Sequence, residues 1–163
     1  MVEVESHRTA EFPVPASRIW ELIADFGGIG KWWPEGTLAR IEVEGEGVGM
    51  VRHMHTVIGL VLSERLDGLD PSERRIDLSI AGDLPGGISS YTAFGRVVEV
   101  APDSCRLEWT GRYRVPTRED EAGARAFLEG AYEMQARGLL EHVTSGAEAG
   151  RPDGSGGIRD EQA

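Results

Sequence analysis

Cysteine, long apolar runs and basic charge are all scarce in this sequence. The one cysteine, Cys105, leaves no partner for an internal disulfide and excludes a zinc cluster built on cysteines. It lies in an alternating run typical of a strand, so we expect a core thiol. No stretch of about 18 consecutive apolar residues occurs, and no basic segment followed by an apolar run opens the sequence. The sequence therefore predicts no membrane insertion and no signal peptide, and we expect a cytoplasmic protein.

The shortage of basic residues also limits the kinds of partner. Lysine and arginine together number 17 against 28 aspartates and glutamates, which gives a formal net charge of -11. Such a chain repels the phosphate backbone that supplies most of the non-specific affinity for nucleic acids. Nucleic acid is therefore not an expected partner.

The apolar content is sufficient for one domain. The chain has 163 residues, of which 40% are hydrophobic, and a single domain of this size can bury about two thirds of its unfolded surface. We expect this domain to cover residues 1–146. Residues 147–163 contain glycine, charged residues and a proline but only one large aliphatic residue, Ile158. They cannot bury enough apolar surface to offset the conformational entropy that the chain loses on ordering. We therefore predict that they are a disordered tail.

The N-terminal part reads as a strand followed by two short helices. Residues 2–12 form the predicted strand, and Pro13 and Pro15 end it because proline cannot donate a hydrogen bond to a neighbouring strand. A helix begins at Pro15 and carries apolar residues at i, i+3, i+4 and i+7 until Gly27 and Gly28 end it. A short helix or turn over residues 29–33 follows.

Six strand-like runs, separated by clusters of turn residues, fill the middle of the sequence. They span residues 38–45, 49–57, 60–67, 74–81, 91–100 and 104–115. Their spacing is typical of an antiparallel meander. A capping box formed by Thr117 and Asp120 then starts a helix of about 28 residues, which is long enough to cross the whole sheet. This order of elements predicts an α+β fold.

Four short segments carry a resemblance to a known family. They are PVPASRIW at residues 13–20, GVGMVR at 47–52, SERLD at 63–67 and EWTGRY at 108–113. Together with the order of elements, they resemble the polyketide cyclase/dehydrase branch of the START-like (SRPBCC) superfamily over residues 2–145. The resemblance implies a helix-grip fold, in which a curved, seven-stranded antiparallel sheet surrounds a long C-terminal helix.

Relatives of this kind include aromatase/cyclases of bacterial polyketide assembly, plant abscisic-acid receptors and the birch-pollen allergen class. All of them hold apolar ligands between the sheet and the helix. The resemblance therefore implies a cavity for a small apolar molecule, and we expect no cofactor.

Glu64 interrupts the apolar face of its predicted strand. Leu60, Leu62 and Leu66 share that face at intervals of two residues. A carboxylate that points inward among them must be paired, hydrated or protonated. The resemblance implies that Glu64 belongs to the polar network of the ligand cavity, as the matching glutamate of the plant receptors does. A structural ion pair with a neighbouring side chain is the alternative interpretation.

The partner of Glu64 across the hairpin depends on the turn at residues 57–59. A three-residue turn sets Arg52 opposite Glu64, whereas a two-residue turn sets His53 there, and one slip exchanges every pair. The resemblance places Arg52 on the cavity side, so His53 and His55 would face solvent. Their i, i+2 spacing could suit a metal, but no third ligand is evident, and we predict no metal site.

Gln135 lies near the middle of the apolar side of the long helix. The same side carries the residues Phe127, Leu128, Ala131, Met134 and Leu139. An unpaired buried amide costs about 1–3 kcal/mol, so Gln135 either bonds the sheet or faces a wet cavity. Tyr132 flanks this stripe. Gly123, Gly130 and Gly138 weaken the helix, which indicates close backbone approach or space for a ligand.

Candidate site residues come from both the sheet and the helix. The candidate catalytic residues are Glu64, Arg52 and Tyr91, the last by resemblance to a cavity tyrosine. The candidate ligand-binding residues are Met54, Thr56, Leu62, Leu78, Ile80, Trp109, Tyr113, Leu128, Tyr132 and Gln135. Aromatic residues with one polar atom suit polycyclic or phenolic ligands, although core packing explains them equally well. Residues 31–34 and 83–88 are candidate gates or plain turns.

Two functions fit these residues. A binding module would hold an apolar, polycyclic or polyketide-like metabolite without converting it. An enzyme of the cyclase/dehydrase kind would use Glu64, Arg52, Tyr91 and Gln135 to orient carbonyls and move protons during aldol closure or loss of water. No nucleophile triad is readable in the sequence. We favour binding, keep the enzyme as the alternative, and expect a monomer or homodimer.

Overall fold

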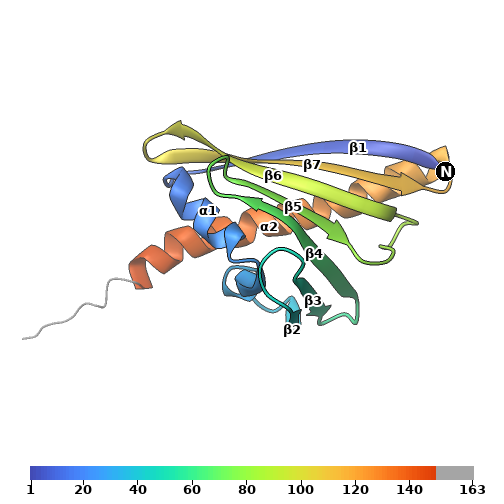
Figure 1. The fold of residues 1–163 in the computed structure, drawn as a ribbon, viewed down its shortest axis with the longest axis horizontal. Helices are drawn as coiled ribbons and strands as arrows, with labels where there is room; N and C mark the ends of the chain where they lie inside the picture. The colour runs from blue at the N-terminus through green and yellow to red at the C-terminus, as the bar shows by residue number, and fades with distance from the viewer. Residues whose placement is uncertain (150–163) are drawn as a thin grey trace, which may run out of the picture.

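The computed structural model describes residues 1–149, which form one curved sheet, two α-helices and two short 3-10 helices (Figure 1). In chain order the elements are β1 (Val2–Phe12), α1 (Ala16–Ala24), η1 (Phe26–Lys31), β2 (Leu38–Glu44), β3 (Val51–Thr56), β4 (Val61–Asp70), β5 (Arg75–Ile80), β6 (Ser89–Ala101), β7 (Ser104–Val115), η2 (Arg118–Asp120) and α2 (Glu121–Ala149). The predicted α+β, helix-grip fold is confirmed.

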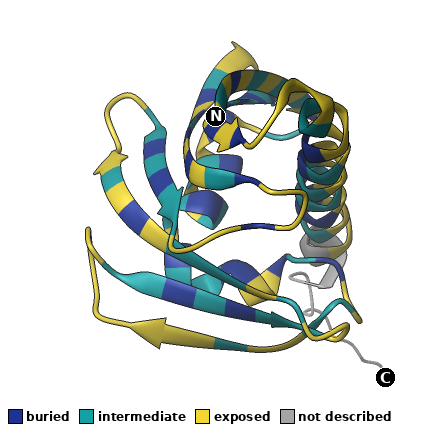
Figure 2. Ribbon diagram, turned by 90° about the vertical axis from the view of Figure 1, so that its right-hand side faces the viewer, coloured by how far each residue is buried: buried dark blue, intermediate teal, exposed yellow. Residues whose placement is uncertain are grey.

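All neighbouring strands pair antiparallel, in the order β1-β7-β6-β5-β4-β3-β2. Strands β2 to β7 are a meander, and β1 returns to pair with β7 from Val2 opposite Val115 to Phe12 opposite Cys105. The sheet curls so that its concave face meets α2 (Figure 2). Each of the six predicted runs is a strand, with its ends displaced by a few residues at most.

The two elements after β1 differ in detail from the prediction. Pro15 is the N-cap residue with an extended ψ of 152°, so α1 begins one residue later, at Ala16. The helix ends at Ala24, because Asp25 leaves the helical region with a ψ of 72°. Gly27 and Gly28 therefore lie inside η1, which the sequence predicted to begin only at residue 29.

Helix α2 begins at the predicted capping box and crosses the sheet. The Thr117 backbone N–H donates to the Asp120 carboxylate over 2.9 Å, and the reciprocal bond of the box is also present. The helix continues to Ala149, three residues beyond the predicted end at residue 146. The rest of the predicted disordered tail, residues 150–163, lies outside the described residues.

Gly138 allows α2 to reach the corner that follows η1. A Cβ at this position would lie 2.3 Å from the carbonyl oxygen of Trp32 and 2.8 Å from the Pro34 ring. The close approach foreseen for the helix glycines is therefore real at Gly138. Gly123 and Gly130 are different, because a Cβ at either would have no neighbour within 4 Å.

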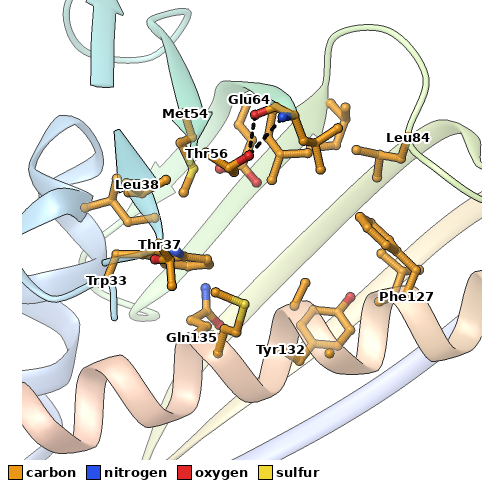
Figure 3. Close-up of a pocket in the computed structure, with 18 of the residues that line it drawn as sticks. Trp33, Thr37, Leu38, Met54, Thr56, Glu64, Leu84, Phe127, Tyr132 and Gln135 are labelled. Carbon is orange, nitrogen blue, oxygen red and sulfur yellow. Dashed lines mark hydrogen bonds between the residues drawn. The ribbon is translucent and has the colours of Figure 1, made fainter. Parts of the chain in front are cut away.

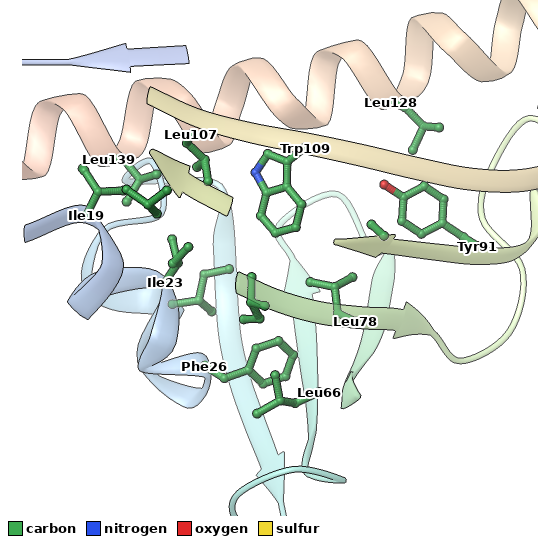
Figure 4. Packing of buried hydrophobic residues seen from close by; sticks show 14 of the residues in the cluster. Ile19, Ile23, Phe26, Leu66, Leu78, Tyr91, Leu107, Trp109, Leu128 and Leu139 are labelled. Atoms are coloured by element: carbon green, nitrogen blue, oxygen red, sulfur yellow. The ribbon is translucent and has the colours of Figure 1, made fainter. Parts of the chain in front are cut away.

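The hydrophobic core lies between α1, the concave face of the sheet and α2 (Figure 4). On β7 the predicted alternation is present, since Cys105, Leu107, Trp109, Tyr113 and Val115 are all buried. Cys105 is fully buried, which confirms a core thiol, and burial raises the pKa of that thiol. Within the described residues, no helix is long and apolar enough to span a membrane.

Candidate functional site

A cavity of about 670 Å³ lies between the concave face of the sheet and α2 (Figure 3). Strands β2 to β7, the segment that joins η1 to β2, and one face of α2 contribute its walls. Of the candidate catalytic and ligand-binding residues, those that line it are Arg52, Met54, Thr56, Leu62, Glu64, Leu78, Ile80, Tyr91, Trp109, Leu128, Tyr132 and Gln135. Tyr113 does not line it.

Arg52 and Glu64 form a buried ion pair on the wall of the cavity. Strands β3 and β4 pair in the register that a three-residue turn predicts, with Arg52 opposite Glu64 and His53 opposite Ser63. Both Nε and Nη2 of Arg52 donate to Glu64 Oε1, over 2.7 and 2.6 Å. The two side chains are 6% and 17% exposed, so water screens the pair only weakly.

Arg52 also makes two contacts with Phe26 of η1. Nη1 donates to the carbonyl oxygen of Phe26 over 2.9 Å, and the guanidinium carbon lies 3.8 Å from the centre of the Phe26 ring. An arginine that stacks on a ring and bonds in the plane of its guanidinium is fixed in position. Arg52 therefore holds η1 and Glu64 together, and its charge is already neutralised.

Glu64 keeps one oxygen available. Both Arg52 donors go to Oε1, and no other group of the described residues donates to Oε2. Oε2 is not one of the fully enclosed, unpaired polar atoms, and Glu64 lines the cavity. The carboxylate thus presents a charged acceptor toward a mostly apolar space. Glu64 is thus both an ion-pair partner and a residue of the cavity wall.

Tyr91 and Tyr132, which both line the cavity, contact each other through their hydroxyl groups. Their hydroxyl oxygens lie 2.5 Å apart, so β6 and α2 are joined by one hydrogen bond. Gly111 makes room for the pair, since a Cβ there would lie within 2.9 Å of both hydroxyl oxygens. Burial, followed by the nearness of Tyr132, raises the pKa of Tyr91 far above its ordinary value. Burial also raises the pKa of Tyr132, so both phenols stay protonated and uncharged at neutral pH.

Tyr113 is buried beside this pair but is not part of the cavity wall. Its ring stacks on Tyr91 with centroids 6.1 Å apart and an interplanar angle of 27°. Its hydroxyl is buried and finds no partner among the described residues. Alternation along β7 placed Tyr113 on the inner face correctly, but it packs against the Tyr91 ring and does not line the cavity.

Gln135 and Trp109 are two further polar groups that the described residues leave without a partner. Gln135 points from α2 toward the sheet across the cavity (Figure 3). It makes no hydrogen bond to the sheet, so the cavity-facing alternative describes its position. The indole of Trp109 is 7% exposed, and its Nε1 is buried without an acceptor. Its ring also packs on Gly95, where a Cβ would lie 2.8 Å away.

Several lining residues were not among the predicted site residues. They are chiefly Ile29, Thr37, Leu38, Val57, Ile58 and Leu84. Ile58 is 83% exposed at the tip of the β3–β4 turn, on the rim of the cavity. Two consecutive β-branched apolar residues in a turn are a signal that could have been noticed. Trp33 and Leu84 line the cavity from the two segments predicted as gates or turns.

His53 and His55 lie on the outer face of β3, as expected. His53 contacts Ser63 at 2.7 Å and Glu44 at 2.9 Å, and His55 contacts Glu42 at 2.8 Å. In the part of the chain that the structure describes, no group of three histidine, cysteine, aspartate or glutamate side chains is arranged to hold a metal ion.

Comparisons with known proteins agree with this geometry. A family model described as polyketide cyclase/dehydrase and lipid transport matches residues 1–144. A comparison with curated protein sequences finds no match.

Among solved structures, norcoclaurine synthase from Thalictrum flavum in complex with a transition-state analogue has a TM-score of 0.74 at 21% identity, covering 90% of this chain and 97% of that one. The same plant enzyme in complex with dopamine and hydroxybenzaldehyde has a TM-score of 0.74 at 22% identity, covering 88% of each chain. A protein from Thermobifida fusca has a TM-score of 0.72 at 25% identity, covering 85% and 91%. These likenesses establish the fold.

Proposed function

Because this chain belongs to the polyketide cyclase/dehydrase and lipid transport family, we propose that it binds a small apolar metabolite, polycyclic or polyketide-like, in the cavity between the sheet and α2. The family comprises both hydrophobic-ligand binding and cyclase chemistry. Binding without conversion is the function that the residues of this cavity support best.

The size and lining of the cavity carry the proposal. A volume of about 670 Å³ falls inside the range of about 300–1,000 Å³ found for small-molecule sites, which are mostly apolar with a few placed polar groups. Protein interiors otherwise pack as densely as organic crystals, so a space of this size inside a small domain is a binding feature. Gly130 supports the same view, because its missing side chain leaves the helix wall open.

The alternative function is an aldol cyclase or dehydrase. One observation favours it: Glu64 presents an unpaired carboxylate oxygen to the cavity, and a carboxylate within reach of an acidic C–H or O–H can act as a general base. Two observations weigh against it. The charge of Arg52 is already paired with Glu64 and its guanidinium also donates to the Phe26 carbonyl, and the raised pKa of Tyr91 makes its phenol a hydrogen-bond donor rather than a base.

Native mass spectrometry of the protein purified from its producing cells separates these functions. A mass increment that is released intact and stays unchanged on further incubation supports binding. A bound molecule that is converted when it is added back supports the cyclase or dehydrase. Protein that remains empty, and that takes up no apolar molecule from a metabolite extract, contradicts both.

A further inference from the structure

We infer that the cavity selects an uncharged ligand that carries a hydroxyl donor, and that it rejects carboxylates such as fatty acids. The inference rests on the proposed binding function and adds the chemical class of the ligand. It is carried by the hydrogen-bond state of each polar group in the cavity wall.

The positive charge in the cavity wall is already paired. Arg52 is the only basic residue among those that line the cavity, and its guanidinium is shared between Glu64 Oε1 and the Phe26 carbonyl. Lys31, the only lysine of the chain, is not a lining residue, and it is held by Asp25 at 2.8 Å on the surface. The described residues of the cavity wall therefore offer no unpaired positive charge to an anionic ligand.

Negative charge in the cavity and on the whole chain disfavours an anionic ligand. A ligand carboxylate in this space would add a second anion near Glu64, whose counter-ion is already in use. Two carboxylates close together in a mostly apolar site repel each other, which opposes binding of the anion. The whole chain, with a net charge of -11, also repels anions as they approach. An anionic headgroup is thus disfavoured both in the cavity and on the way to it.

The hydroxyl groups of the cavity wall already make hydrogen bonds within the protein. The Thr56 hydroxyl donates to the Leu60 carbonyl over 2.8 Å, and the Thr37 hydroxyl donates to the Pro34 carbonyl over 2.6 Å. Tyr91 and Tyr132 bond each other. Glu64 Oε2 on the sheet and the Gln135 amide on the helix are not engaged in this way, and they lie on facing walls (Figure 3). The indole N–H of Trp109 also lacks a partner, but this atom is fully enclosed and not open to a ligand.

These two groups define the ligand's polar pattern. A charged acceptor such as Glu64 Oε2 pairs best with an O–H donor, because hydrogen bonds to an ionised group are about twice as strong as neutral ones. The Gln135 amide can donate to a ligand carbonyl or accept from a second hydroxyl. A neutral, hydroxylated ring system that spans sheet and helix satisfies both, whereas the carboxylate of a fatty acid has no hydrogen to donate to Glu64 Oε2.

A matched set of naphthalene derivatives tests the inference, with the full chain stripped of bound ligand and titrated at pH 7. Naphthalene, 2-naphthol and 2-naphthoate share one skeleton and differ in having no polar group, a hydroxyl donor or a carboxylate. We expect 2-naphthol to bind at least about tenfold more tightly than 2-naphthoate, a difference that corresponds to about 1.4 kcal/mol. Equal or tighter binding of 2-naphthoate overturns the inference.

Naphthalene distinguishes the failure of this inference from the failure of the proposed function. If naphthalene and 2-naphthoate both bind, and the acid binds as well as 2-naphthol, the cavity binds apolar molecules but does not select against acids. If none of the three binds, the binding function is wrong and the inference falls with it.

The variant Glu64→Gln supplies a second readout. It removes the anion and leaves Arg52 without its counter-ion, so 2-naphthoate is expected to gain affinity while 2-naphthol loses it. Thermal unfolding shows whether the variant is folded. If the variant does not fold, the affinities of the three ligands for the unaltered protein still show whether the cavity selects against carboxylates.

Discussion

The hydroxyl oxygen of Tyr91 on β6 lies 2.5 Å from the hydroxyl oxygen of Tyr132 on α2, directly over Gly111. This hydrogen bond links the two layers that enclose the cavity, and it lies where neither phenol can reach bulk water easily. The pair therefore places two buried phenols with raised pKa values at the contact between α2 and the sheet.

The first prediction concerns alkaline pH. Burial and the contact with Tyr132 hold the pKa of Tyr91 above its unfolded value of about 10. Above that pH the unfolded chain releases the phenol proton while the folded chain keeps it, so the free energy of unfolding falls as pH rises. The stabilisation is fully present below pH about 10. Urea unfolding at a series of pH values from 8 upward measures the decline.

The variant Tyr91→Phe is the control for this pH dependence. It removes one of the phenols with a raised pKa, so its stability is expected to fall less steeply at alkaline pH than that of the unaltered protein. Phenolate absorbance supplies the direct readout. If folded protein develops the phenolate signal of all its tyrosines near pH 10, the pH argument is wrong.

The second prediction concerns the buried ion pair. Replacing Arg52 by Met leaves the Glu64 carboxylate buried without a counter-ion, and breaking a buried pair in this way costs about 3–5 kcal/mol. The contact with the Phe26 ring is lost as well. Urea denaturation of Arg52→Met should show this loss in the free energy of unfolding.

An exposed ion pair of the same chain is the matched control. Lys31 and Asp25 lie 2.8 Å apart with side chains 68% and 50% exposed, so Lys31→Met should cost less than about 1 kcal/mol. Comparable losses for the two variants would contradict the structural role assigned to Arg52. The double variant Arg52→Met/Glu64→Leu should recover much of the loss, because no buried charge then remains.

The strand pattern and the Arg52–Glu64 register could be predicted because both follow from local rules. Alternation fixes which side chains face inward, and the length of the turn at residues 57–59 fixes which residues face each other across the hairpin. Gln135 was placed correctly on the cavity side for a similar reason, since helical periodicity alone defines that stripe.

The parts that could not be predicted depend on contacts between distant segments. Nothing near Arg52 in the sequence shows that its third bond goes to Phe26, which lies 26 residues earlier. Tyr113 and Trp109 have the same strand phase, yet Trp109 lines the cavity whereas Tyr113 stacks on the Tyr91 ring and does not. The end of α1 was misplaced because Asp25 leaves the helical region before the two glycines.

The third prediction concerns the contact of α2 with the corner after η1. A methyl group at Gly138 would lie 2.3 Å from the Trp32 carbonyl oxygen, and backbone atoms cannot move aside easily. Overpacking of this kind costs about 1–3 kcal/mol, which exceeds the gain of about 1 kcal/mol that alanine brings to a helix. Gly138→Ala should therefore lower the thermal midpoint, whereas Gly123→Ala, which meets no neighbour, should raise it.

The fourth prediction uses two glycines of α2 to separate the cavity from the rest of the helix. Both Gly123 and Gly130 have no atoms within 4 Å of an added Cβ, but only Gly130 lines the cavity. Leucine at either position improves helix propensity by about the same amount, so neither variant should lose stability. Gly130→Leu should nevertheless weaken 2-naphthol binding by tenfold or more, because its side chain occupies ligand space, while Gly123→Leu should bind as the unaltered protein does. Isothermal titration of the two variants compares them directly, and equal affinities would mean that the ligand lies elsewhere.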